Sequence, residues 1–228
     1  MADGLISIVL PVHNQADHIG GVVAEYGEAL GHIRTDSEIV LVPNACRDDS
    51  EAVCYALARE QAAVRVVPSA RGGWGPAVRL GLEAAQGDIL CYTNSARTEP
   101  QDLVLLLYYA LTNPDAVIKA NRKIREHWSR RLGSLLYNLE CRALFDLSNW
   151  DINGTPKVFP RRFTKLLDLT RDDDLVDLEF NVICRREGYP MVEVPIFSRR
   201  RHGGRSTTTL RSAIRMYSGA YRLSREVR

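Results

Sequence analysis

The first half of the chain alternates short apolar runs with longer segments in which apolar residues recur at helical spacing. The short runs predict buried strands at residues 5–9, 38–42, 64–67, 89–93 and 116–120. The longer segments predict helices at residues 17–31, 50–60, 76–85 and 99–109. Strands that alternate with helices are typical of a parallel sheet with right-handed crossovers. The predicted fold class is therefore α/β.

The second half continues this pattern with longer helices. Helices are expected at residues 130–145 and 175–186, and strands at residues 157–159 and 191–196. With 228 residues, of which 45% are hydrophobic, the chain can bury one sizeable core. We therefore expect a single domain over residues 1–210.

The last residues form a basic amphipathic segment. From Arg199 onward the chain carries nine arginines and a single acid, Glu226. A helix is expected over residues 211–228. Together with Leu210, which comes directly before it, this helix would present an apolar stripe made by Leu210, Ile214, Tyr217 and Tyr221. This stripe could pack on the domain, or the helix could lie on an anionic membrane surface. Both alternatives stay open at this point.

Composition limits the compartment and the partners. The 30 Lys and Arg residues are balanced by 28 Asp and Glu, so the chain lacks the positive field typical of nucleic acid binding. The five cysteines are odd in number and scattered, which favours a reducing compartment. No apolar run approaches the roughly 20 residues that cross a bilayer, and the N-terminus has no basic leader. The sequence predicts a cytoplasmic protein, with peripheral contact at the inner face of a membrane as the open alternative.

Ligands bind beyond the carboxyl ends of the strands in open α/β sheets, and the segments at these ends carry a family pattern. The segments are ISIVLPVHN at residues 6–14, EIVLV at 38–42, GWGPAVRLGL at 73–82 and GDIL at 87–90. They resemble, in order, the first strand and nucleotide loop, the second strand, the glycine loop with its helix, and the following strand of family 2 glycosyltransferases.

The second half narrows the resemblance to the dolichol-phosphate-mannose-synthase-like branch of that family. Four further segments are similar to it: DINGTPKVF at residues 151–159, DLE at 177–179, RREGYPMVEVPI at 185–196 and RHGGRS at 201–206. The resemblance covers nearly the whole chain. It implies a GT-A type fold with a mostly parallel, Rossmann-like sheet, a nucleoside-diphosphate sugar as donor and a polyprenyl phosphate or related lipid phosphate as acceptor.

The resemblance also implies which loops hold the ligands. The candidates for the nucleotide sugar are Pro11, His13, Asn14, Gln15, Asn44, Arg47, Arg71, Gly75, Asn94, Ser95 and Ala96. The candidates for the acceptor phosphate are Arg122, Arg201, Arg205 and Ser206. Arg97, Asp177 and Glu179 are the candidate catalytic residues. Because Asp177 and Glu179 are two residues apart, they cannot share one helical face, and we expect one of them to be structural.

The acids that the family carries around the nucleotide are missing here. Gln15 stands where the family has Glu, Pro43 and Asn44 where it has two Asp, and Asn-Ser-Ala at residues 94–96 where it has Asp-x-Asp. An amide keeps its hydrogen bonds but has no charge, whereas Mg²⁺ is held by carboxylates together with phosphates. We therefore expect no required cofactor, and weak or absent binding of Mg²⁺ or Mn²⁺.

Arginines are the groups left to neutralise the diphosphate. Arg97 follows the altered motif, and Arg47 and Arg71 lie on neighbouring loops. Stabilising the charge of the leaving group is the main electrostatic task of the reaction, and a guanidinium can bind phosphate oxygens in a bidentate fashion. Our hypothesis is that some of these arginines replace the metal.

The sequence leaves three classes of function open. The first is a transferase that inverts the anomeric carbon by direct displacement. A sugar hydroxyl as acceptor would need a base, Asp177 or Glu179, whereas a phosphate monoester, with a second pKa near 6, is already anionic. The second is a degenerate fold that binds nucleotide, sugar or a partner without turnover, and the third is a regulatory subunit of a membrane-bound glycan pathway. The acidic run 172–174 is interpreted as the solvated start of a helix rather than as a metal site.

Overall fold

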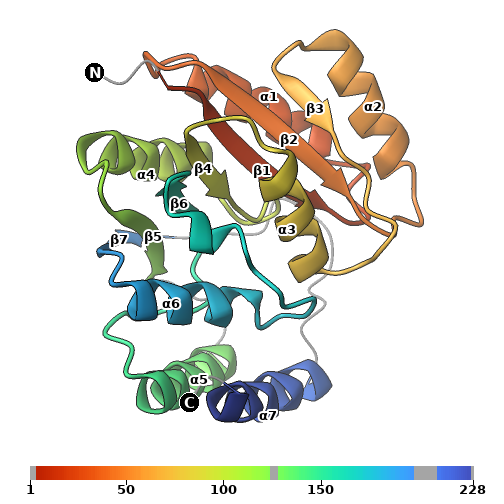
Figure 1. Ribbon diagram of the computed structural model, residues 1–228. Helices are drawn as coiled ribbons and strands as arrows, with labels where there is room; N and C mark the ends of the chain where they lie inside the picture. Colours follow the sequence, from red (N-terminus) through yellow and green to blue (C-terminus); the bar gives the residue numbers. More distant parts are fainter. Residues whose placement is uncertain (1–3, 124–127, 198–209, 227–228) are drawn as a thin grey trace.

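The computed structural model describes residues 4–123, 128–197 and 210–226. The strands are β1 (Ile6–Val12), β2 (Ser37–Pro43), β3 (Val64–Val66), β4 (Ile89–Tyr92), β5 (Val117–Arg122), β6 (Lys157–Pro160) and β7 (Met191–Ile196). They form one sheet in the order β3-β2-β1-β4-β6-β5-β7 (Figure 1). Neighbouring strands are parallel except that β6 runs antiparallel to both β4 and β5. The α/β class with a mostly parallel sheet is confirmed.

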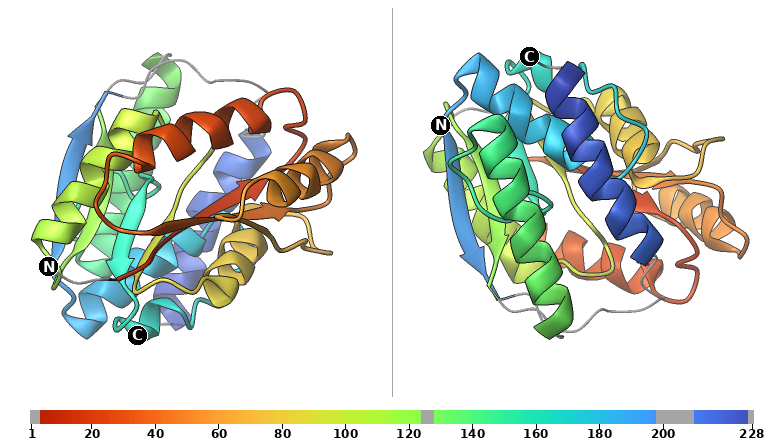
Figure 2. Two further views of the ribbon diagram at one scale, coloured as in Figure 1. Left: turned by 90° about the horizontal axis from the view of Figure 1, so that it is seen from above. Right: turned by 90° about the horizontal axis from the view of Figure 1, so that it is seen from below.

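Helices cover both faces of this sheet. They are α1 (Ile19–Leu30), α2 (Ser50–Glu60), α3 (Trp74–Ala84), α4 (Pro100–Thr112), α5 (Trp128–Phe145), α6 (Val176–Glu187) and α7 (Leu210–Glu226). One face packs against α1, α2 and α4, and the other against α3 and α6. Outside α6, α5 and α7 lie side by side as a further layer (Figures 1 and 2).

Strand β1 is buried along its whole length because both faces of the sheet are covered. Ile6, Ile8 and Leu10 belong to the core on the α1 and α4 side, whereas Val9 belongs to the core on the α3 side. Gly81 lets α3 approach closely, since a Cβ at this position would lie 2.2 Å from Cγ1 of Val9. The strand ends that carry the candidate site are therefore held by a rigid centre.

The C-terminal helix packs against the domain through a face that includes Tyr217 of the predicted stripe but not Tyr221. Its buried face runs through Ala220 and Leu223, and the hydroxyl of Tyr217 donates to the carbonyl of Gly133 in α5 at 2.6 Å. Tyr221 is 50% exposed, so this residue of the predicted stripe lies outside the packed face. The helix turns its buried face toward α5 and α6, and this rotation could not be read from spacing alone. The side chains of residues 210–214 lie outside the described part.

Candidate functional site

The loops that follow β1 and β2 are tied together by polar side chains. His13 donates from Nδ1 to the carbonyl oxygen of Asn44 at 2.7 Å, and its Nε2 accepts from the amide of Asn14 at 3.2 Å. Because a carbonyl oxygen only accepts, this geometry requires the tautomer protonated at Nδ1. Asn14 also accepts the backbone N–H of Arg47 at 2.7 Å. Asn14 has a φ of 52°, a conformation that Asn tolerates better than most residues.

The loop that follows β4 joins the same rim. The hydroxyl of Ser95 donates to Oε1 of Gln15 at 2.6 Å, and both side chains are buried. Asn94 forms a tight turn, because its Oδ1 accepts the backbone N–H of Ala96 at 3.0 Å. Asn14 and Asn94 thus lie on two loops that are bonded directly to each other. We call the loop residues 13–15, 44–47 and 94–97 the rim.

The residues of the altered Asp-x-Asp position do not fit a divalent cation. Asn94 and Ser95 offer only neutral oxygens, of which Oδ1 of Asn94 already accepts a backbone N–H, and Ala96 is 1% exposed and offers no ligand atom. Hard cations need several oxygen ligands, preferably carboxylates. Over the described ranges, no group of three or more His, Cys, Asp or Glu side chains is placed to hold a metal ion.

Asn44 is a buried bridge. Its amide donates to the carbonyl oxygens of Val12 and Val42 at 2.8 and 3.2 Å, and its Oδ1 accepts the backbone N–H of Gly73 at 3.1 Å. At 3% exposure the side chain has no free face toward a ligand. An aspartate could not make the two donations, so the amide is required by the packing of β1, β2 and the glycine loop.

Other predicted nucleotide contacts have local roles as well. Arg71 forms an exposed ion pair with Asp172 at 2.8 Å. Gly75 allows close backbone approach, because a Cβ there would lie 2.5 Å from the carbonyl oxygen of Arg171. Pro11 is buried within β1, and the backbone N–H of Arg97 donates to the carbonyl of Asn94 at 3.0 Å.

Asp177 lies buried at the first turn of α6 and accepts three hydrogen bonds. The donors are Nε1 of Trp74 at 3.1 Å, the hydroxyl of Tyr92 at 2.9 Å and Nζ of Lys157. The carboxylate is 5% exposed, and Lys157 is fully buried. Asp177 therefore joins the glycine loop, β4 and β6, and its oxygens are occupied by partners of the protein itself.

Beneath Asp177 a row of polar side chains crosses four strands. In register, Tyr92 of β4 lies opposite Lys157 of β6, Lys157 opposite Lys119 of β5, and Lys119 opposite Glu193 of β7. Lys119 contacts Glu193 at 2.7 Å. Burial lowers the pKa of Lys157 to about 8 and lowers that of Lys119, although Asp177 and Glu193 respectively act in the opposite direction. We call Tyr92, Lys157, Lys119, Glu193 and Asp177 the buried row.

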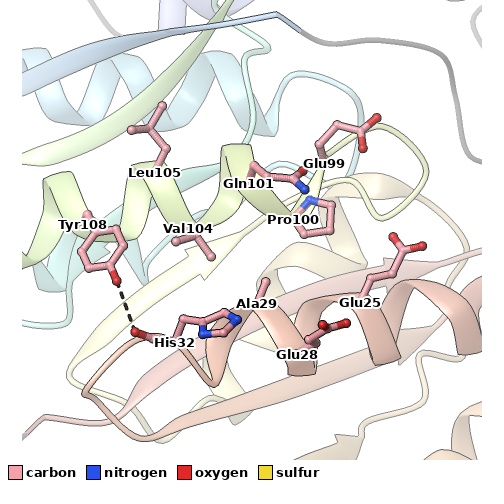
Figure 3. Close-up of a pocket in the computed structure, with 10 residues that line it drawn as sticks. All are labelled: Glu25, Glu28, Ala29, His32, Glu99, Pro100, Gln101, Val104, Leu105 and Tyr108. Carbon is pink, nitrogen blue, oxygen red and sulfur yellow. Dashed lines mark hydrogen bonds between the residues drawn. The ribbon is translucent and has the colours of Figure 1, made fainter.

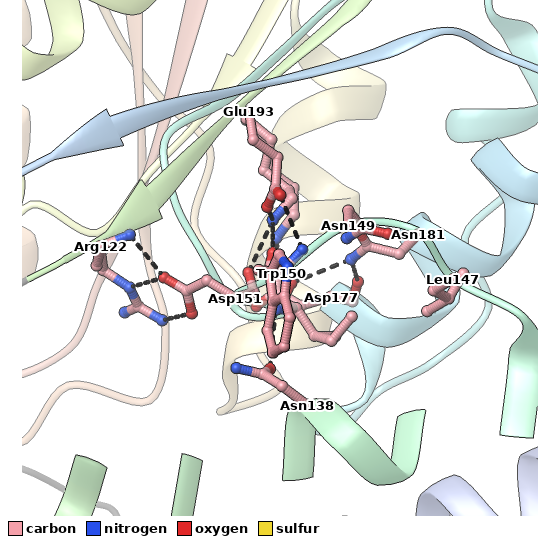
Figure 4. Close-up of polar contacts among 12 residues, drawn as sticks. Arg122, Asn138, Leu147, Asn149, Trp150, Asp151, Asp177, Asn181 and Glu193 are labelled. Carbon is pink, nitrogen blue, oxygen red and sulfur yellow. Dashed lines mark hydrogen bonds and ion pairs between the residues drawn. The ribbon is translucent and has the colours of Figure 1, made fainter. Parts of the chain in front are cut away.

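The buried row also supports the predicted acceptor arginine. Nζ of Lys119 donates to the carbonyl oxygens of Trp150 and Asp151, the latter at 2.9 Å. The carboxylate of Asp151 accepts Nε and Nη2 of Arg122, each at 2.8 Å, as a bidentate pair (Figure 4). Because the pair uses Nε and Nη2, Nη1 of Arg122 lies outside it. Arg201, Arg205 and Ser206 lie outside the described residues.

Glu179 holds the segment that precedes α6. Its carboxylate accepts the backbone N–H groups of Thr170 at 3.0 Å and Arg171 at 2.9 Å, together with the hydroxyl of Thr170. Asp172 of the same segment pairs with Arg71 and Arg79. These contacts give Glu179 a structural role in this loop.

Several of these groups were not among the sequence candidates. Lys119 and Lys157 were assigned to strands, and Trp74 and Asp151 were quoted only as parts of motifs. The sequence carried one signal for such a group: Lys119 lies within a run predicted to be a buried strand. Because an unpaired charge is rarely buried, a lysine in this place indicates a partner. Their partners Glu193 and Asp177 are distant in sequence, so the pairs themselves could not be predicted.

A groove of about 690 Å³ lies away from the rim and the buried row, between α1 and α4 (Figure 3). It combines acids such as Glu25 and Glu99 with the half-exposed side chains of Leu105 and Tyr108. These two helices cover the face of the sheet opposite α3 and α6, so the groove is separate from the glycine loop and the buried row.

No described helix is both long and apolar enough to span a bilayer.

Residues 7–173 match the model of the family described as glycosyl transferase family 2. Among curated proteins, the chain is similar to two undecaprenyl-phosphate 4-deoxy-4-formamido-L-arabinose transferases. The protein from Pseudomonas fluorescens is 23% identical over 210 residues, which are 90% of this chain and 61% of the relative. The protein from Aeromonas hydrophila is 25% identical over 141 residues, which are 59% of this chain and 42% of the relative. The chain thus spans less than two thirds of either relative.

Among solved structures, the fold is shared with glucosyl-3-phosphoglycerate synthase from Mycobacterium tuberculosis. The complex with Mn²⁺, UDP-glucose and phosphoglyceric acid has a TM-score of 0.74 at 20% identity, covering 96% of this chain and 77% of that chain. The UDP complex has a TM-score of 0.71 at 21% identity, covering 95% and 80%. At this identity the likeness shows the GT-A fold alone.

Proposed function

We propose, because the chain belongs to glycosyl transferase family 2, that it transfers a sugar from a nucleoside-diphosphate sugar to a polyprenyl phosphate or related acceptor. The observation that carries the donor half of this proposal is the rim. Three strand-end loops are bonded to one another by neutral side chains and bear Arg47 and Arg97, while Arg71 lies on the adjoining glycine loop. Loops at this edge of an open α/β sheet are where nucleotides bind.

The acceptor half rests on Arg122 and on the relatives. The two curated relatives are named as undecaprenyl-phosphate transferases. Arg122 is held by Asp151 with Nη1 outside the pair, and a guanidinium fixed in this way is suited to a phosphate oxygen. The Arg-rich segment after β7, with Arg201 and Arg205, would add further charge.

The proposed reaction is a single displacement. An oxygen of the acceptor phosphate attacks the anomeric carbon, and the bond to the donor diphosphate breaks with its electron pair staying on the leaving group, so the configuration inverts. Asp177 and Glu179 already accept hydrogen bonds from other parts of the chain, so neither is placed as a free base. A phosphate monoester, with a second pKa near 6, needs none.

Arg47 and Arg97 of the rim, with Arg71 of the glycine loop, take the role that a metal has in other members of the fold. Isothermal titration of UDP and GDP, each with Mg²⁺ and with chelator, tests this. We expect a nucleoside diphosphate to bind in chelator, and Arg97→Ala or Arg71→Ala to weaken binding about tenfold. Arg59→Ala, an exposed change on α2, is the control. Binding that requires Mg²⁺ or Mn²⁺ would contradict the metal-free part of the proposal.

A binding module without turnover is the second candidate. The buried, saturated Asn44 and the buried Ala96 favour it, because neither can contact a diphosphate through its side chain. Incubation with undecaprenyl phosphate and whichever sugar nucleotide binds separates the two. Formation of a lipid-linked sugar supports the transferase, and tight binding with no product supports the module.

We further propose a cytoplasmic protein that contacts the inner face of a membrane through α7. Its packing leaves Arg222 and Arg225 exposed, and each basic residue near an anionic surface contributes about 1 kcal/mol. Flotation with phosphatidylglycerol vesicles should recover the native chain, and the double change Arg222→Gln and Arg225→Gln should reduce the recovered fraction. Equal recovery of both proteins would rule out this contact.

A further inference from the structure

The groove between α1 and α4 takes no part in the site described above (Figure 3). The described residues that line it lie between positions 25 and 32 on α1 and just after it, and between positions 99 and 108 at the start of α4. Each stretch covers two to three helical turns, roughly 11–14 Å. The volume of about 690 Å³ is within the range of ligand sites. A gap of this length between two helices suits the docking of a third helix.

The floor of the groove is apolar. Ala29 of α1 and Val104 of α4 lie between the two helices (Figure 3). Leu105 is 40% exposed and Tyr108 is 46% exposed. The hydroxyl of Tyr108 donates to the carbonyl oxygen of His32 at 3.2 Å, so its ring is held across one end of the groove. An apolar strip that faces solvent between polar borders is typical of a contact surface for another protein.

The charged side chains of the groove are acidic. Glu25 and Glu28 lie on its α1 border, and Glu99 lies at the start of α4 (Figure 3). None of the described lining residues is Lys or Arg. Glu25 and Glu28 are exposed, and neither forms an ion pair with another described residue. A field of this sign repels the phosphates of nucleotides and anionic lipids and attracts a cationic partner.

A second copy of this chain does not combine both features on one helix, as far as its side chains are described. The exposed arginines Arg222 and Arg225 belong to α7, whose apolar Leu223 is already buried. Exposed leucines such as Leu136 belong to α5, whose Arg142 already donates to the loop that follows this helix. A helix that fills the groove needs apolar and basic side chains on adjoining faces, which favours a helix of another protein.

We propose that the groove docks a basic amphipathic helix of a partner protein. Leucine or similar side chains of that helix pack on Val104 and Leu105, and its Lys or Arg side chains face Glu25 and Glu28. Because α1 and α4 cover the face of the sheet opposite α3, the docked helix leaves the glycine loop accessible. A partner in the groove and a nucleotide at the rim can therefore be bound together, and docking does not depend on the proposed function.

Fluorescence anisotropy of a labelled synthetic peptide, titrated with the whole chain, tests this docking. The probe is a helix of about 18 residues that carries Leu at i, i+3, i+4 and i+7 spacing and Lys elsewhere. We expect the double change Glu25→Lys and Glu28→Lys to weaken binding about tenfold or more, because repulsion replaces attraction. Tyr108→Ala should weaken it about tenfold through lost apolar contact. A peptide with Glu in place of Lys should bind the native chain at least about tenfold more weakly.

The control variants change the same residue types on α2, outside the groove. The double change Glu51→Lys and Glu60→Lys reverses two exposed acids, and Tyr55→Ala removes a ring that is 40% exposed. These variants should bind the peptide like the native chain. Cooperative thermal unfolding of every variant shows that the fold is intact, whether or not a nucleotide binds.

Each outcome has a definite meaning. Weaker peptide binding in the groove variants but not in the α2 variants supports the docking site. A native chain that does not bind the peptide, or equal binding by the groove and α2 variants, overturns it. Sedimentation equilibrium of the native chain tests the other occupant. Self-association that is abolished by Glu25→Lys with Glu28→Lys means that a second copy fills the groove, which also overturns the proposal.

Discussion

The rim and the buried row treat charge in opposite ways. In the rim, Asn14, Gln15, Ser95 and Asn44 bond to one another's loops through neutral groups, and of its arginines Arg47 is exposed and Arg97 is partly buried. In the buried row, two fully buried lysines are matched to carboxylates from α6 and β7. Both regions join segments that are distant in sequence, but one does so without ionic groups.

This difference bears on the proposed binding of an anionic ligand at the rim, where the neighbouring acid Asp48 already accepts the backbone N–H of Ala16 at 3.1 Å. Neutral side chains bring no repulsion to a diphosphate, so on the proposed function fewer arginines would be needed to balance it. The buried row keeps its charges away from solvent, and there Asp177 accepts the indole N–H of Trp74 and Lys119 donates to the carbonyl oxygen of Asp151, whose carboxylate holds Arg122. Pairs in such surroundings are costly to break, because the partner left behind is desolvated.

Breaking the buried row at Asp177 is the change with the largest expected effect. Asp177→Ala leaves Lys157 without its carboxylate and Trp74 and Tyr92 without their acceptor. We expect the free energy of unfolding to fall by about 3–5 kcal/mol in urea denaturation. Asp168→Ala removes a carboxylate from an exposed pair on the surface, and should change stability by less than about 1 kcal/mol. Equal effects of the two changes would mean that the buried row does not stabilise the fold.

Alkaline pH should act on the buried row through Lys157. Burial lowers its pKa to about 8, below the ordinary value of 10.5. Between these values the unfolded chain holds the proton and the native chain does not, so the contribution of Lys157 rises with pH toward 10.5 and is lost as pH falls through 8. From pH 7.5 to 10, native stability should therefore rise relative to Lys157→Met by at most about 3 kcal/mol. The exposed change Lys165→Met should show no such pH dependence.

Replacing a rim amide by an acid tests whether the rim depends on neutral side chains. Asn44→Asp removes the two donations to Val12 and Val42 and sets a buried carboxylate against their carbonyl oxygens. We expect a loss of about 2 kcal/mol by urea denaturation. Asn14→Asp, the same change at an exposed position of the rim, keeps the bond from Arg47 and should lose less than about 1 kcal/mol. If both variants are as stable as the native chain, the amide at Asn44 is not required by packing.

Much of the fold could be predicted from local pattern. The α/β class and the expected strands follow from apolar runs and helical spacing, because β1 and β2 are buried on both faces and contain few polar residues. The motifs also identified the loops that meet at the rim. The antiparallel direction of β6 was not visible, since a strand of four residues reads the same in either direction.

The roles of individual site residues were harder to predict from the sequence than the fold was. Gly75 and Asn44 were predicted as nucleotide contacts, and the structure adds a local role to each: close backbone packing for Gly75 and a bridge between segments for Asn44. Glu179 was a candidate base and holds the backbone of residues 170–171. In each case the partner lies far along the chain or in another segment, so spacing carries no information about it.

By itself, the sequence determined where strands end, which loops carry amides in place of acids, and where the arginines concentrate. Those are properties of single segments, and they follow from burial patterns and residue chemistry. Only the tertiary structure decided that Lys157 meets Asp177, that Lys119 meets Glu193, and that Trp74 donates to Asp177. Such contacts depend on strand order and register, which bring together residues that local patterns treat as independent.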